Sequence, residues 1–337
     1  MRTYPLFDRN HVTIKGLPFL TEDHYSRLPK EMMDDIAREN KSLLWLGDHL
    51  SGGIIFFETD AKNLHVTIEY AYEPLMNHMA PSGESGFDLY VKQEDQWIFY
   101  DVIRPFPRQK MVEVNIQLPD KTSNTLMIYT PLYTKVIRAN VTVEDNEIIQ
   151  PFDPKYDQTI FFYGTSITQG ACASRPGLSF TNQLSRMLGI EVINMGFSGN
   201  GLGERSTAQI THLCSNLSMI VIDYDANAGA VGKIEETLIP WINIVRQVHQ
   251  EIPILILSRI PFNREIFDEK DFIHRMKNKD YQKRVANQLE NIHFIDGEWL
   301  IQKNETEVTV DGIHLNDLGM SLFAQRLVPY IATNLKR

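Results

Sequence analysis

The sequence predicts two domains of different classes, an all-β sandwich or jelly roll followed by a three-layer α/β domain. The chain has 337 residues, more than one typical domain needs. Short alternating segments rich in β-branched and aromatic residues fill its first half, whereas apolar runs alternate with helical stretches in its second half. Pro151 and Pro154 mark the junction, because proline interrupts regular structure. We therefore expect the sandwich over residues 1–150 and the α/β domain over residues 156–337.

The first half reads as a series of short strands. Examples of the expected strands are residues 53–59, 64–70, 97–102, 112–116 and 126–129. Glycine, proline, asparagine and aspartate separate these segments. Such spacing is typical of an antiparallel sandwich, in which alternate residues of each strand are buried between two sheets.

The second half reads as alternating strands and helices. Buried parallel strands are expected at residues 159–163, 192–195, 219–222, 252–257 and 293–295. Helices are expected at residues 179–188, 235–250, 280–290 and 316–335. This order predicts a doubly wound sheet, whose functional sites form at the carboxyl ends of the strands.

Composition excludes several classes of partner. The net charge is −10 and no basic run is present, so nucleic acid and anionic membranes are not expected partners. The two cysteines, Cys172 and Cys214, are expected to be reduced thiols. Residues 1–20 lack the pattern of a secretory signal, and no run of about 18 apolar residues exists. A cytoplasmic protein is therefore expected, with no pattern that specifies its oligomeric state.

A serine and a distant Asp-x-x-His supply the elements of nucleophilic catalysis. Ser166 follows the first strand of the α/β half, and Asp311 and His314 precede the last helix. A serine hydroxyl becomes a good nucleophile when an imidazole takes its proton and a carboxylate orients that imidazole. We predict these roles for Ser166, His314 and Asp311, in that order. Taken singly, the three residues also suit a helix N-cap, a surface histidine and a capping aspartate.

Two further loops offer hydrogen-bond donors. The glycine-rich segment 196–201 follows the second strand, and Asn227 follows the third. Backbone N–H groups of such a turn and an amide NH₂ suit a developing oxyanion, although ordinary loops have the same composition. No further histidine or cysteine lies at ligand spacing from Asp311 and His314, so no metal and no cofactor are expected.

Together these segments resemble the four sequence blocks of the SGNH (GDSL-type) hydrolase superfamily. Gly164-Thr165-Ser166 stands where that family has Gly-Asp-Ser, and Gly199, Asn227 and Asp311-Gly312-Ile313-His314 match the other three blocks. The resemblance implies a flavodoxin-like domain and a serine esterase that forms an acyl-enzyme. It also implies an oxyanion hole made by the N–H groups of Ser166 and Gly199 and the side chain of Asn227.

The first half resembles the domain that precedes one SGNH subfamily. Its segment Gly86-Phe87-Asp88-Leu89-Tyr90 is similar to the Gly-x-Asp-Leu-Tyr signature of that β-sandwich. Two departures occur in the second half. Thr165 replaces the aspartate of the first block, and the third block reads Asp-Tyr-Asp-Ala-Asn, so Asp223 or Asp225 could form local hydrogen bonds.

The expected substrate is a short-chain ester, with an acetyl group on a small molecule or carbohydrate. Expected substrate contacts are His78, Met79, Phe197 and Arg175. The long loop over residues 73–85 is expected to help form the active-site mouth, although it also suits simple packing. Two alternatives stay open: a thioesterase or acyltransferase with the same triad, or a carbohydrate-binding protein with an inactive hydrolase domain.

Overall fold

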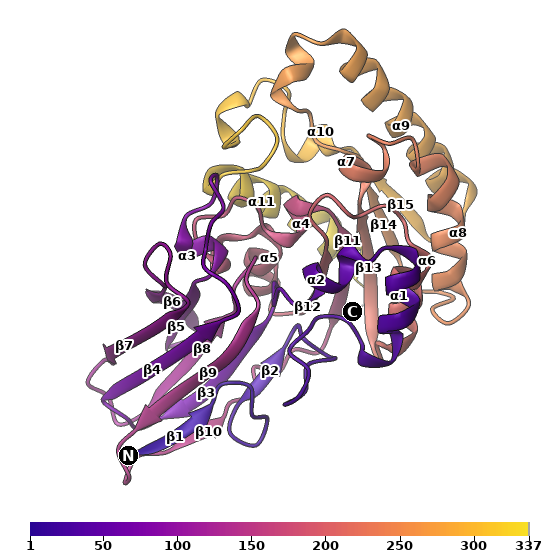
Figure 1. The fold of residues 1–337 in the computed structure, drawn as a ribbon. Helices are drawn as coiled ribbons and strands as arrows, with labels where there is room; N and C mark the ends of the chain where they lie inside the picture. Colours follow the sequence, from indigo (N-terminus) through magenta and orange to yellow (C-terminus); the bar gives the residue numbers. More distant parts are fainter. Residues whose placement is uncertain (336–337) are drawn as a thin grey trace. The chain divides into compact units, whose positions relative to one another are not determined.

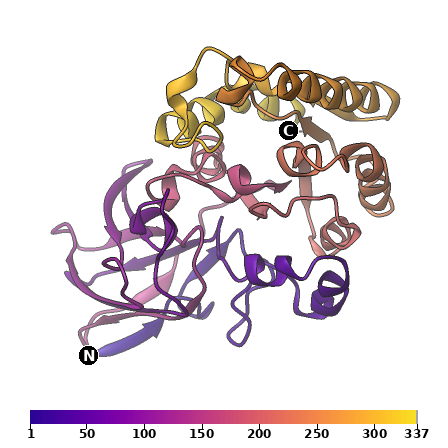
Figure 2. The same cartoon turned by 45° about the horizontal axis from the view of Figure 1, so that its top comes forward.

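The computed structural model describes residues 1–335, which form two compact units (Figures 1 and 2). The first unit comprises Met1–Arg27, Gly47–Tyr156 and Ser174–Gly177. The second comprises Leu28–Leu46, Asp157–Ala173 and the chain from Leu178 onward. The boundary between the units therefore does not follow the order of the chain. Leu28–Leu46 packs in the second unit although it lies within the N-terminal half, and Ser174–Gly177 packs in the first unit although it lies within the C-terminal half.

The first unit is built from two antiparallel sheets. One sheet has the strand order β1-β9-β4-β7, and the other has the order β10-β3-β8-β5-β6 with β2 added beside β3. The strands are β1 (Arg2–Pro5), β2 (Thr13–Lys15), β3 (Ile54–Thr59), β4 (Asn63–Tyr70), β5 (Phe87–Gln93), β6 (Gln96–Ile103), β7 (Met111–Gln117), β8 (Asn124–Tyr129), β9 (Val136–Val143) and β10 (Ile149–Pro151). A short helix, α3 (Pro81–Glu84), lies between β4 and β5.

Alternation along the strands produces the core of this unit. In β4, Leu64, Val66 and Ile68 are buried, whereas the residues between them are more exposed. These side chains join Ile55 of β3 and Ile128 of β8 in one hydrophobic cluster, so the core contains residues of both sheets. Complete burial of one such aliphatic side chain contributes about 1.5–3 kcal/mol. The predicted antiparallel sandwich is confirmed.

The segment Ser174–Gly177 is held in the first unit by the Gly86–Tyr90 motif. The guanidinium of Arg175 donates to Asp88 Oδ2 at 2.6 Å and to the Tyr90 hydroxyl at 2.8 Å. The backbone N–H of Gly177 donates to the same Asp88 oxygen at 2.8 Å. Asp88 is fully buried, and an ion pair in that setting needs such additional donors to offset its desolvation. The motif thus supplies the carboxylate that fixes this segment.

The second unit contains a five-stranded parallel sheet with the order β12-β11-β13-β14-β15. The strands are β11 (Thr159–Gly164), β12 (Glu191–Gly196), β13 (Leu217–Asp223), β14 (Ile254–Leu257) and β15 (Ile292–Ile295). Gly164 at the end of β11 lies opposite Gly196 of β12 and Asp223 of β13. The loops that follow these three strands therefore start side by side. Strand order reverses at β11, which is where doubly wound sheets form their binding crevice.

Helices connect and flank this sheet. They are α1 (Met33–Glu39), α2 (Ser42–Gly47), α4 (Ser166–Gln169), α5 (Phe180–Leu188), α6 (Arg205–Ile210), α7 (Asp225–Ala228), α8 (Ile234–Arg246), α9 (Glu269–Gln288), α10 (Gly297–Leu300) and α11 (Asp317–Asn334). Phe180 of α5 packs on Phe323 of α11 with ring centroids 4.4 Å apart. The predicted α/β class is confirmed. Within residues 1–335, no helix combines the length and apolar character that crossing a membrane requires.

Candidate active site

Ser166 is the first residue of a short helix that begins directly after β11. Thr165 caps this helix, and its hydroxyl accepts a hydrogen bond from Ile167 N. Gly164 must be glycine, because a Cβ there would lie 2.0 Å from Thr168 Oγ1 and 2.8 Å from Asp223 O. Because the Thr165 side chain caps the helix, the hydroxyl of Ser166 is not needed for capping.

Ser166, His314 and Asp311 form a hydrogen-bonded relay. Ser166 Oγ lies 2.9 Å from His314 Nε2, and His314 Nδ1 lies 2.7 Å from Asp311 Oδ2. The second carboxylate oxygen of Asp311 accepts the backbone N–H groups of Ile313 and His314 at 3.0 and 2.8 Å. These distances are those of a nucleophile, its base and the group that orients the base.

The environment of Asp311 favours its ionised form. Burial alone would raise the pKa of this carboxyl, but its hydrogen bonds to the imidazole and backbone of His314 and to the Ile313 N–H hold that pKa below its ordinary value. An ionised Asp311 accepts the N–H at Nδ1 and leaves Nε2 of the imidazole as the acceptor toward Ser166. The loop thus presents His314 in the tautomer that a general base requires.

The turn after β12 presents Gly199. This glycine has φ +68°, and no atom lies within 4 Å of the position that its Cβ would take. Asn200 closes the turn: its N–H donates to Phe197 O at 2.9 Å, and its side chain donates to Ser198 O at 2.9 Å. The Gly199 N–H itself has no hydrogen-bond partner among residues 1–335. It is therefore available to a ligand.

Asn227 lies in α7, directly after β13. Its Oδ1 accepts the backbone N–H of Gly201 at 3.3 Å. This bond directs the amide NH₂ away from Gly201, and within the described chain that NH₂ group donates to no residue. Two donors without a partner among the described residues therefore come from segments that follow β12 and β13, the strands adjacent to β11.

Asp223 and Asp225 take structural positions in the third block. Thr168 Oγ1 donates to Asp223 Oδ2 at 2.8 Å, which ties the helix of Ser166 to the end of β13. Burial raises the pKa of Asp223 to about 7. Asp225 accepts the Arg259 N–H and the Gln282 side chain, both at 2.9 Å. Both carboxyls thus form hydrogen bonds, but to partners distant in sequence rather than to the local partners that the sequence suggested.

The four expected substrate contacts differ in their surroundings. Phe197 is fully buried, and the guanidinium of Arg175 is engaged by Asp88, by Tyr90 and by the face of Phe99, 3.8 Å from the ring centroid. We therefore do not retain these two as substrate contacts.

The other two contacts belong to the loop over residues 73–85. His78 is half-buried beside Asn77, and Met79 is buried. Glu84 organises this loop by accepting the N–H groups of Leu75 and Met76 at 3.0 and 2.9 Å. Substrate contact by His78 and Met79, and the contribution of the loop to an active-site mouth, stay predictions.

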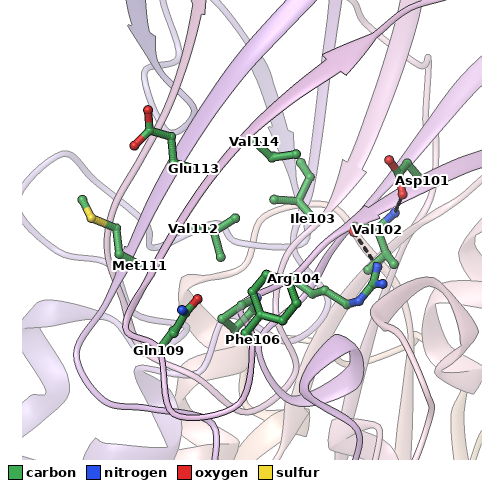
Figure 3. Close-up of a pocket in the computed structure, with 11 residues that line it drawn as sticks. Asp101, Val102, Ile103, Arg104, Phe106, Gln109, Met111, Val112, Glu113 and Val114 are labelled. Atoms are coloured by element: carbon green, nitrogen blue, oxygen red, sulfur yellow. Dashed lines mark hydrogen bonds between the residues drawn. The ribbon is translucent and has the colours of Figure 1, made fainter.

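A separate cavity of about 290 Å³ lies in the first unit, beside β6 and β7 (Figure 3). Ile103, Val112 and Phe106 supply apolar surface there, and Arg104 bonds the local backbone at Val102. None of the predicted site residues lines it. This cavity is therefore separate from the predicted catalytic residues.

Comparison with known families gives two matches that together span most of the chain. Residues 157–332 match the GDSL-like Lipase/Acylhydrolase family. Residues 5–149 match GxDLY, described as the N-terminus of the SGNH-hydrolase type of esterase. No curated protein shows significant sequence similarity to the chain.

Solved structures share the whole two-unit fold. A protein from Bacteroides ovatus designated a GDSL-like lipase has 24% sequence identity and a TM-score of 0.86, with 99% of this chain and 98% of that chain covered. A salicylyl-acyltransferase from a tetracycline biosynthetic pathway has 17% identity, a TM-score of 0.77 and coverage of 98% and 97%. An acetyl xylan esterase from the rumen bacterium Butyrivibrio proteoclasticus has 12% identity, a TM-score of 0.60 and coverage of 99% and 98%. At these identities the likeness establishes the fold.

Proposed function

Because the chain belongs to the GDSL-like lipase/acylhydrolase family, we propose that it hydrolyses short-chain esters through an acyl-enzyme on Ser166. The observation that carries this proposal is the relay from Ser166 through His314 to Asp311, with both bonds under 3 Å. A helix-capping serine would point its hydroxyl at backbone N–H groups, whereas here Thr165 caps the helix. The same residues are thus arranged for proton transfer.

In the proposed first step, Ser166 Oγ attacks the ester carbonyl while His314 Nε2 takes the hydroxyl proton. Asp311 stabilises the imidazolium that forms. The tetrahedral intermediate collapses when His314 protonates the leaving alcohol, which gives the acyl-enzyme. Water then attacks the acyl group by the same route and regenerates Ser166.

The developing oxyanion is proposed to bind the N–H groups of Ser166 and Gly199 and the NH₂ group of Asn227. The last two donors have no partner among the described residues, which supports this role. Loss of one oxyanion donor typically lowers turnover by about 10²–10³. Asn227→Ala is therefore expected to lower kcat within that range.

We propose acetyl esters, including acetylated sugars, as the substrate class. Ser166 is only 7% exposed, which favours a small acyl group. An acetyl xylan esterase also shares the whole fold, although at 12% identity this supports the substrate only by analogy. Acyl transfer is the second candidate, because a salicylyl-acyltransferase shares the same two-unit fold at a TM-score of 0.77.

The test compares wild type with Ser166→Ala on p-nitrophenyl acetate and on a panel of acetylated sugars. Ser123→Ala is the control, because Ser123 is an exposed residue of the first unit. Loss of turnover in Ser166→Ala alone supports the proposal, and equal turnover in all three proteins refutes it. Adding alcohol acceptors separates the two candidates, because a transferase forms new esters at the expense of free acetate.

A cytoplasmic location is also proposed. Both cysteines are buried and unpaired, and burial raises the pKa of each thiol to about 12, which keeps them unreactive. This usage suits a reducing compartment. Fractionation of cells of the source organism, with the protein detected by antibody, tests the location.

A further inference from the structure

The N-terminal segment Leu28–Leu46 packs within the second unit, beside the turn that carries Gly199. Figures 1 and 2 show its helix α1 next to α6. Glu39 at the end of α1 accepts both the N–H and the hydroxyl of Ser206, at 2.8 and 2.6 Å. A segment far from Ser166 in sequence is therefore fixed to the helix that follows the Gly199 turn.

Asn40, the next residue, has its side chain fixed at both ends. Its Oδ1 accepts the Ser42 N–H at 3.2 Å, and its Nδ2 donates to Glu204 Oε1 at 2.7 Å. The same Nδ2 lies 3.3 Å from Asn200 Oδ1. Because the bond from the Ser42 N–H holds Oδ1 of Asn40, the Nδ2 group of the same amide is a donor of fixed position toward the turn that carries Gly199.

Glu204 joins this donor to the strand that precedes Ser166. Its second oxygen, Oε2, accepts the Tyr163 hydroxyl at 2.7 Å and the Leu202 N–H at 3.2 Å. Tyr163 is fully buried and lies in β11 directly before Gly164. Glu204 therefore fixes the end of the Gly199 turn relative to β11, and Asn40 supplies the donor for its remaining oxygen.

Both proposed oxyanion donors, Gly199 and Asn227, are connected to Asn40 through the residues that follow Gly199. Asn200, which Asn40 contacts, follows Gly199 and closes the turn through its bonds to Phe197 O and Ser198 O, the two residues before Gly199. Gly201, the residue after Asn200, donates its N–H to Asn227. Gly199 has no packing neighbour at its Cβ position, so the bonds of its flanking residues must fix its N–H.

We propose that Asn40 is a positioning residue of the oxyanion hole. It holds Glu204 and Asn200, and through them the Gly199 N–H and the Asn227 amide, in the geometry that the tetrahedral intermediate requires. This inference rests on the proposed esterase function. Because the oxyanion exists only in the transition state and intermediate, loss of Asn40 should lower kcat and leave KM nearly unchanged.

The test uses Asn40→Asp, which keeps the side-chain volume but removes the donor, and Asn40→Ala. Asp34→Ala is the control, because Asp34 is exposed on α1, the helix that ends just before Asn40, and its side chain bonds to none of residues 1–335. We expect kcat on p-nitrophenyl acetate to fall about tenfold in both Asn40 variants, less than the roughly 10²–10³ expected for direct loss of a donor. KM should stay within about twofold, and the control should match wild type.

A second readout probes the oxyanion hole without turnover. A p-nitrophenyl alkylphosphonate forms a bond between Ser166 Oγ and phosphorus, releases p-nitrophenolate, and leaves the proton on His314. Its phosphonyl oxygen occupies the oxyanion position, so phosphonylation should slow by a similar factor of about ten in the Asn40 variants. In a double-mutant cycle, Asn40→Asp added to Glu204→Gln should cost less than Asn40→Asp alone, because the two side chains act as a pair.

The outcomes separate this inference from the function on which it rests. If Ser166→Ala keeps esterase turnover, the proposed function is wrong. If Ser166→Ala is inactive but both Asn40 variants keep wild-type kcat and phosphonylation rates, the function stands and the role of Asn40 is refuted. A raised KM at unchanged kcat also refutes it. Thermal unfolding measures the folded fraction of each variant. If Asn40→Ala does not fold, the outcome is judged from Asn40→Asp, which keeps the size of the side chain.

Discussion

At the scale of single residues, Asp311 has two tasks that different atoms perform. Oδ1 accepts two backbone N–H groups and fixes the loop, while Oδ2 accepts the imidazole N–H. Asp311→Asn keeps the shape but can offer the imidazole an NH₂ group, which favours the wrong tautomer of His314. We expect kcat/KM to fall by about 10³–10⁴ with the fold intact. Steady-state kinetics at pH 8 checks this, with the exposed Asp280→Asn as control, and an active Asp311→Asn would contradict it.

Asp223 makes stability depend on pH. Its pKa is raised from an ordinary 3.8 to about 7, chiefly by burial. The folded protein therefore binds a proton more tightly than the unfolded chain, and this contribution to stability is complete below about pH 4 and is lost as pH rises through 7. Asp223→Asn should remove this part of the pH dependence. Urea unfolding between pH 4.5 and 7.5 tests it, and equal slopes of unfolding free energy in both proteins would refute it.

The residues of the candidate site differ in how readily the sequence reveals them. Ser166, Asp311 and His314 were predictable, because a nucleophile, an acid and a base at motif spacing carry their chemistry in their residue types. Asn40 and Glu204 were not, because their bond joins positions far apart in sequence and neither residue type is unusual in a loop. Phe197 and Arg175 show the converse, since residue types suited to binding a sugar are engaged here in packing and an internal ion pair.

At the scale of elements, α9 is a helix that the sequence pattern predicts only in part. The sequence predicts a helix over residues 280–290, whereas α9 extends over Glu269–Gln288. Hydrophobic periodicity fails there because the buried face of the helix is mostly polar: Arg275, Asn278 and Gln282 are all buried. A continuous apolar run, in contrast, located β3 to within one residue, and apolar alternation did the same for β4. A helix that buries polar side chains depends on hydrogen-bond and ion-pair partners elsewhere in the chain. The local sequence does not contain these partners, so it does not reveal the helix.

The polar face of α9 leads to a prediction of stability. Glu265 is fully buried and accepts Arg259 at one oxygen and Arg275 at the other, both at 2.7 Å. Glu265→Ala leaves the buried guanidinium groups of Arg259 and Arg275 with only their longer carboxylate contacts, to Asp271 at 3.4 Å and Glu298 at 3.7 Å, so the free energy of unfolding should fall by about 3–5 kcal/mol. Denaturant titration measures it. Asp280→Ala, at an exposed position of α9, should change the free energy of unfolding by less than about 0.5 kcal/mol. Similar losses in the two variants would contradict the role of Glu265.

At the scale of the whole molecule, the chain order and the compact units do not coincide. A linear division at residues 151–154 would assign Leu28–Leu46 to the sandwich, but these residues pack in the second unit. Sequence pattern could not reveal this, because composition reports the class of a segment and not which core it joins. Ile36 and Leu43 are fully buried, and each such side chain stabilises its unit by about 1.5–3 kcal/mol. The second unit therefore depends on residues that lie, in sequence, between two segments of the first unit.

A fragment of residues 156–337 should consequently be less stable than the second unit in the full chain. It lacks the apolar contacts of Ile36 and Leu43 and the polar bonds of Glu39 and Asn40. Joining residues 28–46 to its N-terminus through a flexible glycine–serine linker should raise its Tm, and should raise its kcat on p-nitrophenyl acetate by restoring the Asn40–Glu204 bond. The matched control carries the same linker with Ile36→Ser, Asn40→Asp and Leu43→Ser in that segment. If the bare fragment and both fusions unfold at one temperature and turn over ester equally, the N-terminal segment is dispensable and the second unit is complete from residue 156 onward.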